Sequence, residues 1–436
     1  YWVVAFSANA TGESGWLLLG LTGMGYAVGA QAYWVIVGEM IGIAASWGFI
    51  SRKLKRLSDE TDSITLPDVL AANFDDRWHL IRGVAVAIIA VMVTTYVSAQ
   101  MVATGKAFSG FVGLDYRAGV IIGAIIIIGY TFVGGYKAVS YTDVVQGVLM
   151  LAGLIAVPLV AISAAGGWGQ MTATLNEYDP GFIDMFSVLD GSTAGFVAAV
   201  SFAAIGLPFL GVPQMLIRYM SARDDTELKK ARIVSITVLF IFLFGAVTAG
   251  IAGRALFPGL EDSEQVFPTL ASELFPPLLT GVLFVIVLSA IMSTVDSLLL
   301  LASSSIVRDT MQKILGNPSS DATLAGYGKV VTVIIGVIAV FVAVYMAENK
   351  LIFWFVLFSW SGLGAAFGPV VLALLYDRRT TGAGIVAGML GGFLTSLVWV
   401  QFFKAGAYGL YEAIPGFTVA AVATVVVSRM TGKQSR

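Results

Sequence analysis

Twelve long apolar stretches dominate this sequence, and they constrain its fold more than any other feature. A helix needs about 20 mostly apolar residues to cross a bilayer, and these stretches are close to that length or longer. Charged residues are only 12% of the 436 positions, whereas a soluble globular chain carries about 25%. The sequence therefore predicts an all-α polytopic membrane protein, with spans at residues 3–27, 31–50, 81–108, 118–135, 143–162, 194–219, 233–255, 277–306, 330–347, 353–376, 383–403 and 407–428.

The composition excludes several classes of protein. Without cysteine the chain has no disulfide and no thiolate ligand or nucleophile, and one histidine cannot build a histidine metal cluster. A formal net charge of −2 offers no basic face to a nucleic acid. The segments between the spans are too short for a soluble catalytic domain. We therefore expect no enzyme activity and no nucleic-acid partner, and we expect membrane lipids and a small solute as partners.

Lys and Arg are unevenly divided between the loops. Twenty of the 25, Arg218 among them, lie on one side of the predicted spans, and five, including Lys106, lie on the other. Loops rich in Lys and Arg face the cytoplasm. This pattern predicts a multi-pass protein of the cell membrane with a cytoplasmic C-terminus. It also predicts that no Lys or Arg lies deep inside a span.

Two of the spans are interrupted by residues that weaken helices. The first contains Ala-Thr-Gly-Glu-Ser-Gly at 10–15, and the sixth contains Gly-Leu-Pro-Phe-Leu-Gly-Val-Pro at 206–213. Either glycine and proline are simply common in membrane helices, or the breaks line a cavity. Four spans follow each break, as in transporters built from inverted repeats. We therefore expect a first repeat at 1–164, an extracellular loop at 165–193, a second repeat at 194–376, and two peripheral helices with a cytoplasmic tail at 377–436.

Four acidic residues fall inside the spans or at their edges: Glu13, Glu39, Asp143 and Asp296. A charged carboxylate at a helix centre costs at least about 2.5 kcal/mol unless it is paired or protonated. Because no basic partner is expected in the spans, these acids indicate a site for a cation or a proton. Glu13 either responds to such an ion beside the first break or stays protonated and bonds the broken backbone. Glu39 is interpreted as a structural buried acid.

Three polar residues of the spans each allow two interpretations. Asp143 opens an apolar run, so it is either the N-cap of the fifth span or a functional group. Ser293 and Thr294 lie beside Asp296 and Ser297. Their oxygens suit a hard cation, but Ser and Thr in membrane helices usually bond the carbonyl four residues back.

Further polar and aromatic residues have an equally open role. Tyr96 and Gln100 are one turn apart and share a helix face, so they either contact a polar solute or pack within the bundle. Trp360 is interpreted as a packing or interfacial residue. The acids at 261, 262 and 264 are interpreted as a solvated surface of an external loop.

Several motifs give the chain a resemblance to the sodium/solute symporter family, and most strongly to its sodium/proline symporter branch. They follow one another in the family's order over nearly the whole chain. The most specific are GGYKAVSYTDVVQGVLM from Gly134, SAIMSTVDSLLLLASSSIVRD from Ser289 and FSWSGLGAAFGPV from Phe358, supported by SGWLLLGLTG from Ser14, TLPD from Thr65 and GLPFLGVPQMLIRYMSA from Gly206.

The resemblance implies a leucine-transporter-like core of ten helices in two inverted repeats of five, with additional C-terminal helices. A helix usually precedes this core in the family. Because the first residue here is tyrosine rather than methionine, we expect that the numbering starts inside a longer chain that contains this helix. The family binds Na+ through the broken first helix and the eighth helix. By motif match, the ligands are the backbone carbonyls of Ala10, Glu13 and Ala290 and the hydroxyls of Ser293 and Thr294.

Other matched positions concern ion release and the solute. Asp143 matches an aspartate linked to sodium passage toward the cytoplasm, which favours its functional interpretation. The proline branch has an aspartate and a methionine where Gly12 and Glu13 stand, and a tryptophan and a tyrosine where Ile205 and Phe209 stand. We therefore expect a solute pocket that is less polar than that of a proline carrier, lined by Ser14, Gly15, Tyr96, Gln100, Phe209 and Pro213.

The expected function is Na+-coupled symport of a small organic solute into the cell by alternating access. The solute is an amino acid such as proline, or a carboxylate. The alternative is a transporter-like solute sensor within a membrane signalling protein, which a cytoplasmic signalling domain would distinguish from a carrier.

Overall fold

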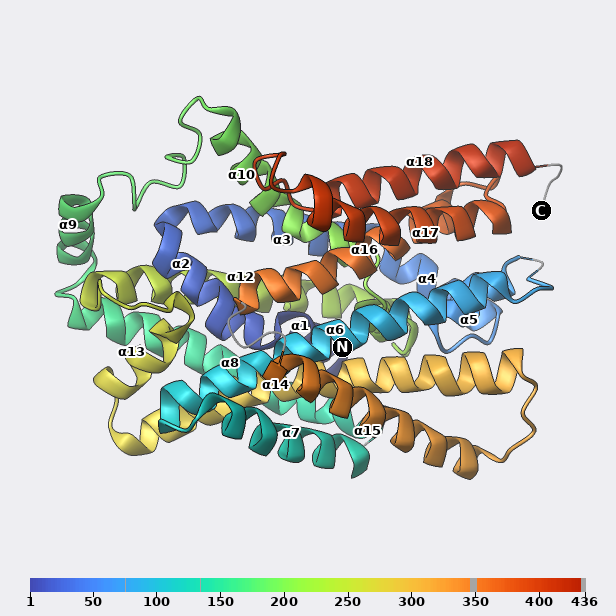
Figure 1. Cartoon of the computed structure of the whole chain (residues 1–436), viewed down its shortest axis with the longest axis horizontal. Helices are drawn as coiled ribbons and strands as arrows, with labels where there is room; N and C mark the ends of the chain where they lie inside the picture. Colours follow the sequence, from blue (N-terminus) through green and yellow to red (C-terminus); the bar gives the residue numbers. More distant parts are fainter. Residues whose placement is uncertain (75, 134, 346–350, 433–436) are drawn as a thin grey trace.

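The computed structural model describes residues 1–436 except 75, 134, 346–350 and 433–436. Long helices run side by side along one axis, and the described residues include no strand (Figure 1). Ten helical segments of this part of the chain are long and apolar enough to cross a membrane, and Tyr116–Phe132 is a shorter apolar helix. One of the ten, Trp2–Glu60, contains both the first and the second predicted span. Each of the twelve predicted spans therefore falls on helical segments, although several edges differ and residues 134, 346 and 347 of the spans 118–135 and 330–347 lie outside the described residues.

The first five spans, the segments between them and one helix after the fifth span occupy the first part of the chain. Their elements are α1 (Trp2–Gly15), η1 (Trp16–Leu21), α2 (Thr22–Val28), η2 (Gly29–Ala32), α3 (Tyr33–Ala45), η3 (Ser46–Ile50), α4 (Ser51–Glu60), α5 (Leu66–Ala72), α6 (Leu80–Val112), α7 (Tyr116–Val133), α8 (Tyr136–Ala164) and α9 (Trp168–Tyr178).

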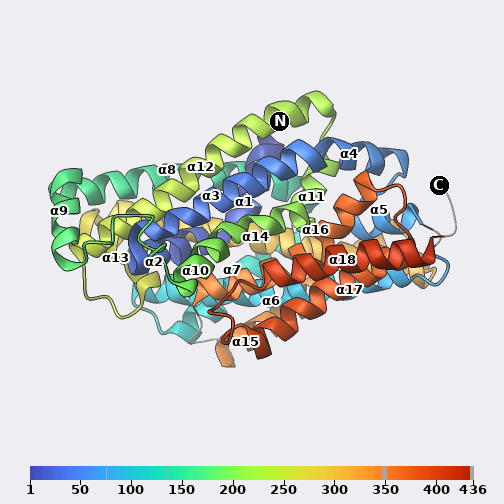
Figure 2. The ribbon, with the colours of Figure 1, turned by 90° about the horizontal axis from the view of Figure 1, so that it is seen from above.

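The remaining seven spans follow in the second part of the chain. Their elements are α10 (Thr193–Ala203), η4 (Ala204–Leu210), α11 (Pro213–Met220), α12 (Asp225–Leu256), η5 (Ser263–Gln265), α13 (Val266–Leu274), α14 (Pro277–Ser304), η6 (Ser305–Ile314), α15 (Asp321–Tyr345), α16 (Ile352–Tyr376), α17 (Gly382–Val398), η7 (Trp399–Phe403) and α18 (Ala413–Thr431). The pair α17 and α18 lies along one side of the bundle (Figure 2).

The first helix lies at the centre of the bundle, where it packs against α8, α11, α12 and α14. Small residues let some of these helices approach closely. A Cβ added to Gly42 of α3 would come within 2.0 Å of the carbonyl oxygen of Gly206 in η4. The second broken helix is therefore held backbone to backbone against α3.

Both predicted breaks are confirmed. The first falls at Ser14, whose φ of 31° and ψ of −169° interrupt the helix. The second falls at Gly211 and Val212, between the 3-10 segment η4 and α11, which starts at Pro213. Asp143 lies two turns inside α8, whose N-cap is Gly135. The interpretation of Asp143 as an N-cap is therefore wrong.

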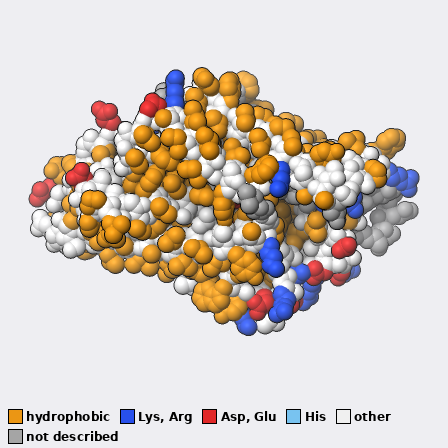
Figure 3. All heavy atoms as spheres, turned by 90° about the horizontal axis from the view of Figure 1, so that it is seen from below, with side chains coloured by type: hydrophobic (Ala, Val, Ile, Leu, Met, Phe, Trp, Pro, Cys, Tyr) orange, Lys and Arg blue, Asp and Glu red, His pale blue; other side chains and the backbone are white. Residues whose placement is uncertain are grey.

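The long tract between the fifth and sixth spans contains one helix, α9, and then folds back onto the second span. Ala30 N donates to the carbonyl of Phe182 at 2.8 Å, and Trp34 Nε1 donates to the carbonyl of Met185 at 2.9 Å. Hydrophobic side chains cover most of the face in Figure 3, with Lys and Arg gathered mainly toward one end. Such a surface suits a bilayer with polar boundaries.

Candidate functional site

Oxygen atoms of α1 and α14 meet in a buried cluster. Ser293 Oγ donates to the carbonyls of Ala10 at 2.9 Å and Ala290 at 3.0 Å. Thr294 Oγ1 lies 3.3 Å from the carbonyl oxygen of Ala10, 3.1 Å from that of Thr11 and 3.4 Å from that of Ala290. The hydroxyls thus bond their own helix and the broken helix at once. The bond to the carbonyl four residues back is found for Thr294, and the role of both hydroxyls as cation ligands stays a prediction. Two hydroxyls and three carbonyls form a set of hard oxygen ligands.

The break in α1 explains why one of these carbonyls is available. In a continuous helix the carbonyl of Thr11 would accept from the N–H of Gly15, four residues later. Instead, Gly15 N donates to Gln100 Oε1 of α6 at 3.0 Å. The carbonyl of Thr11 is therefore free to receive the hydroxyl of Thr294.

The predicted sodium ligand Glu13 occupies a different position from the other four. Its carbonyl accepts from the N–H of Trp16, and Thr11 stands where Glu13 was expected in the cluster. Glu13 and Glu39 are 1% and 3% exposed, and Oε2 of each has no hydrogen-bond partner among the described residues. In the same part of the chain, neither carboxyl group forms an ion pair with a Lys or Arg.

The predicted solute residues meet at the same break. Gln100 Nε2 donates to Ser14 Oγ at 3.2 Å, in addition to the bond from Gly15. The ring centroid of Trp360 in α16 lies 6.5 Å from that of Tyr96 and 5.0 Å from that of Phe209, with nearly perpendicular planes. Trp360 also donates from Nε1 to the carbonyl of Ile205 at 3.2 Å.

Pro213 and Trp360 both lie at the second broken helix. Pro213 is buried at the first position of α11, directly after the second break. Trp360 is 4% exposed and packs inside the bundle, which confirms its interpretation as a packing residue. It also connects two predicted solute residues with the second broken helix.

A buried arginine is the main correction to the sequence analysis. Arg218 of α11 is only 3% exposed. Its guanidinium donates to Ser7 Oγ at 3.0 Å, Thr11 Oγ1 at 3.1 Å, Ser297 Oγ at 2.5 Å and Asp143 Oδ2 at 3.4 Å. The prediction that Asp143 has no basic partner is therefore wrong. Arg218 is buried in the bundle although it lies at the end of the predicted sixth span. Arg218 was assigned to a loop because it lies near the end of an interrupted helix.

Arg218 separates the oxygen cluster from a cavity. Thr11 contributes its carbonyl to the cluster and its hydroxyl to Ser297, 3.0 Å away. Arg218 and Ser297 then line a cavity of about 770 Å³, together with Thr131 and Tyr136. A path from the cluster toward this cavity would pass the guanidinium of Arg218.

A second buried ion pair corrects the interpretation of the acidic loop. Glu264 is buried, and its carboxylate accepts from Lys106 Nζ at 2.7 Å. It also accepts from the N–H groups of Ile352 at 3.0 Å and Phe353 at 2.9 Å at the start of α16. A carboxylate at this end of a helix bonds amides that have no partner within the helix. Glu264 is thus a structural group rather than part of a solvated surface.

Comparison with known proteins gives consistent results. A sequence model described as "Sodium:solute symporter family" matches residues 1–392. The high-affinity proline transporter PutP of Bacillus subtilis (strain 168) is 36% identical over 440 residues, which are 100% of this chain and 91% of that protein. A sodium/proline symporter of Staphylococcus aureus is 36% identical over 445 residues, covering 99% and 86% of the two chains.

Solved structures support the fold. A Na+-coupled sialic acid symporter superposes with a TM-score of 0.82 at 17% identity, covering 99% of this chain and 90% of that one. A nucleobase-cation-symport-1 family transporter has a TM-score of 0.57 at 13% identity, with coverage of 100% and 94%. The expected leucine-transporter-like fold is confirmed by these likenesses.

Proposed function

The chain belongs to the sodium:solute symporter family, and from this premise we propose that it carries an amino acid such as proline, or a small carboxylate, together with Na+ across the cell membrane. The single observation that carries the ion site is the oxygen cluster of Ala10, Thr11, Ala290, Ser293 and Thr294. The match to transporters over nearly their whole length favours a carrier over a solute sensor.

The proposed ion site joins two helices. Na+ replaces the hydrogen bonds that Ser293 and Thr294 make to the broken helix, so that hydroxyl lone pairs and carbonyls face the ion. Binding then ties α1 to α14 by ligands from both. Glu13, whose carbonyl was the fifth expected ligand, takes part only if the backbone beyond Thr11 turns toward the ion.

The proposed solute site lies on the other side of the break. Ser14, Gly15 and Gln100 supply polar contacts, and Tyr96, Phe209 and Trp360 supply apolar walls. A carboxylate of the solute is proposed to approach the start of α11, after Pro213, where the amides of Met215 and Leu216 donate to the carbonyl of Val212 in the absence of a ligand. Because the ion and the solute both stabilise the broken first helix, each tightens the binding of the other.

The proposed direction is inward, with the Lys- and Arg-rich loops and the C-terminus in the cytoplasm. The cavity lined by Arg218 and Ser297 is then the cytoplasmic exit, and Na+ leaves past Arg218 and Asp143. A membrane potential of ~100 mV adds about 2.3 kcal/mol for each charge that moves inward. A four-helix bundle is proposed to rock inward against the rest of the helices, and this motion releases Na+ past Asp143.

Uptake by the purified protein in proteoliposomes tests the proposal. Labelled proline and small carboxylates are offered with an inward Na+ gradient, with the same gradient of K+, and with neither. We expect accumulation of one solute only with Na+, and faster accumulation when the interior is negative. Equal uptake in K+ would contradict Na+ coupling.

A further inference from the structure

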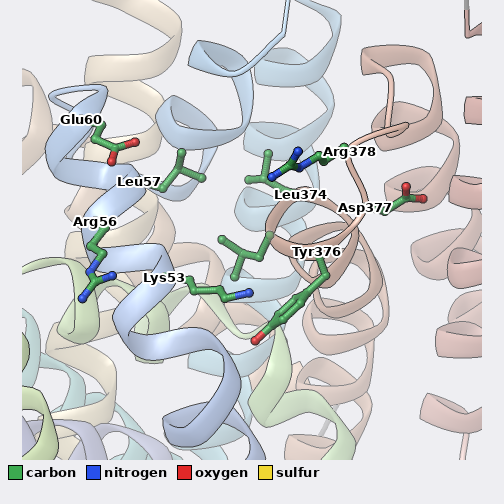
Figure 4. A pocket seen from close by; sticks show the side chains of 9 residues that line it. Lys53, Arg56, Leu57, Glu60, Leu374, Tyr376, Asp377 and Arg378 are labelled. Carbon is green, nitrogen blue, oxygen red and sulfur yellow. The ribbon is translucent and has the colours of Figure 1, made fainter. Parts of the chain in front are cut away.

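A pocket outside the transport site opens between α4 and the end of α16. Its volume is about 500 Å³. Leu57 of α4 and Leu374 and Leu375 of α16 form its apolar wall, and Lys53 and Arg378 extend along its rim (Figure 4). The pocket therefore combines an apolar wall with one cationic side chain from α4 and another from the turn that follows α16.

Two of the charged residues around this pocket already have partners. Arg56 is paired with Asp225 of α12. Asp377 accepts from Arg429 Nη2 of α18 at 2.8 Å and from the N–H of Arg379 at 3.0 Å. Arg56 and Asp377 therefore each have an oppositely charged neighbour outside the pocket lining.

The other two cations have no carboxylate partner among the described residues. Lys53 Nζ lies 3.4 Å from the centroid of the Tyr376 ring, so an aromatic face holds it rather than an acid. Arg378 makes no ion pair in the described part of the chain. Glu60 at the end of α4 is the remaining acid of the lining. The pocket thus offers two unpaired positive charges against one negative charge.

The position of the pocket identifies the kind of anion. Both α16 and the helical stretch that ends with α4 belong to membrane spans, so the pocket lies where these spans leave the apolar region. Tyr376 Oη donates to the carbonyl of Phe49 in η3 at 2.7 Å. The side chains of Phe49 and Ile41, on the same helical stretch as α4, are 61% and 65% exposed. An apolar, outward-facing strip therefore leads along the second span to the cationic rim.

We propose that this pocket binds the phosphate of an anionic phospholipid, with Lys53 and Arg378 as its ligands. The acyl chains lie along the strip of Ile41 and Phe49 while the headgroup enters between α4 and α16. Arginine presents a planar fork that matches a phosphate, and lysine adds a point charge. Basic pockets between helix ends are a known arrangement for lipid headgroups. A zwitterionic lipid fits less well, because its own cation opposes Lys53 and Arg378.

Lipid titration of the purified full-length chain, followed by native mass spectrometry in detergent, tests the proposal. Each basic residue near an anionic surface contributes about 1 kcal/mol, which is about fivefold in affinity. We expect Lys53→Gln and Arg378→Gln each to weaken phosphatidylglycerol binding about fivefold, and the double variant about 25-fold. Glu60→Gln should tighten binding, because it removes the opposing charge.

Matched controls separate this pocket from general charge effects. Lys229→Gln removes one exposed positive charge from α12, outside the pocket lining, and should leave the affinity unchanged. Lys53→Arg keeps the charge and should retain binding. The proposal is overturned if phosphatidylcholine binds as tightly as phosphatidylglycerol, or if the double variant binds like the original chain. It is also overturned if inorganic phosphate competes as well as the lipid, since the ligand would then be a free anion.

Discussion

Replacing Arg218 with glutamine tests the buried network that joins four helices. The substitution removes the guanidinium that bonds Ser7, Thr11, Ser297 and Asp143. Asp143 is fully buried, and its Oδ1 has no hydrogen-bond partner among the described residues. After the change, the hydroxyl of Ser7, 2.6 Å from Oδ2, is the one hydrogen-bond partner of Asp143 that remains in the described part of the chain. Breaking one side of a buried ion pair typically costs about 3–5 kcal/mol, because a charge remains buried without compensation.

A double-mutant cycle separates this cost from general damage to the helix. Asp143→Asn should cost less than Arg218→Gln, because Arg218 keeps three hydroxyl partners. The double variant should recover much of the loss, with an interaction free energy of about 0.5–3 kcal/mol. Thermal unfolding of the purified variants in one detergent gives the order of stability. If Arg218→Gln unfolds at the temperature of the original chain, or if the two effects simply add, the network does not hold the helices as described.

The remaining predictions concern the ion site, the helix contact and the solute site. Thr294→Ala should raise the Na+ concentration needed for half-maximal uptake about tenfold, as expected for the loss of ~1.4 kcal/mol. The control is Ser303→Ala on the same helix, which should leave this concentration unchanged because Ser303 donates to a carbonyl of its own helix. Equal Na+ dependence in both variants would remove Thr294 from the site. Gly42→Ala should destabilise the protein and abolish uptake, because the added Cβ would lie 2.0 Å from the carbonyl oxygen of Gly206. Gly48→Ala is the matched control and should change neither, because no atom lies within 4 Å of a Cβ at that position. Trp360→Ala should weaken solute affinity with little change in Na+ affinity, because Trp360 contacts Tyr96 and Phe209. The half-saturation concentrations of solute and Na+ in uptake measure the two affinities separately. A shift in Na+ affinity alone would place Trp360 in the ion site instead.

The positions of the helices and of their breaks could be predicted from the order of residues along the chain. Both depend on local properties, namely the length of an apolar run and the weak helix propensity of glycine and proline. The edges were less certain, as α8 illustrates. It starts at Tyr136, seven residues before the apolar run that opens at Asp143. The predicted start was too late because the first two turns of the helix contain polar residues, which a search for apolar runs does not include.

The pairing of buried charges could not be predicted in this way. Arg218 follows two prolines near the end of an interrupted span, and in a linear sequence it resembles any loop arginine. It is buried because α1, α8, α11 and α14 converge on it, and three of these helices supply hydroxyl or carboxylate partners from distant positions. Lys106 and Glu264 form their pair across 158 positions for the same reason.

The sequence by itself determined that this chain spans a membrane, and that its first and sixth spans are broken. These conclusions need only the free energy of placing each side chain or backbone unit in an apolar medium. The tertiary structure decided which carbonyls join the cluster. Thr11 contributes its carbonyl because Gly15 gives its amide to Gln100, 85 positions away. A hydrogen bond between distant residues depends on how helices are oriented in space, and local propensities contain no information about that orientation.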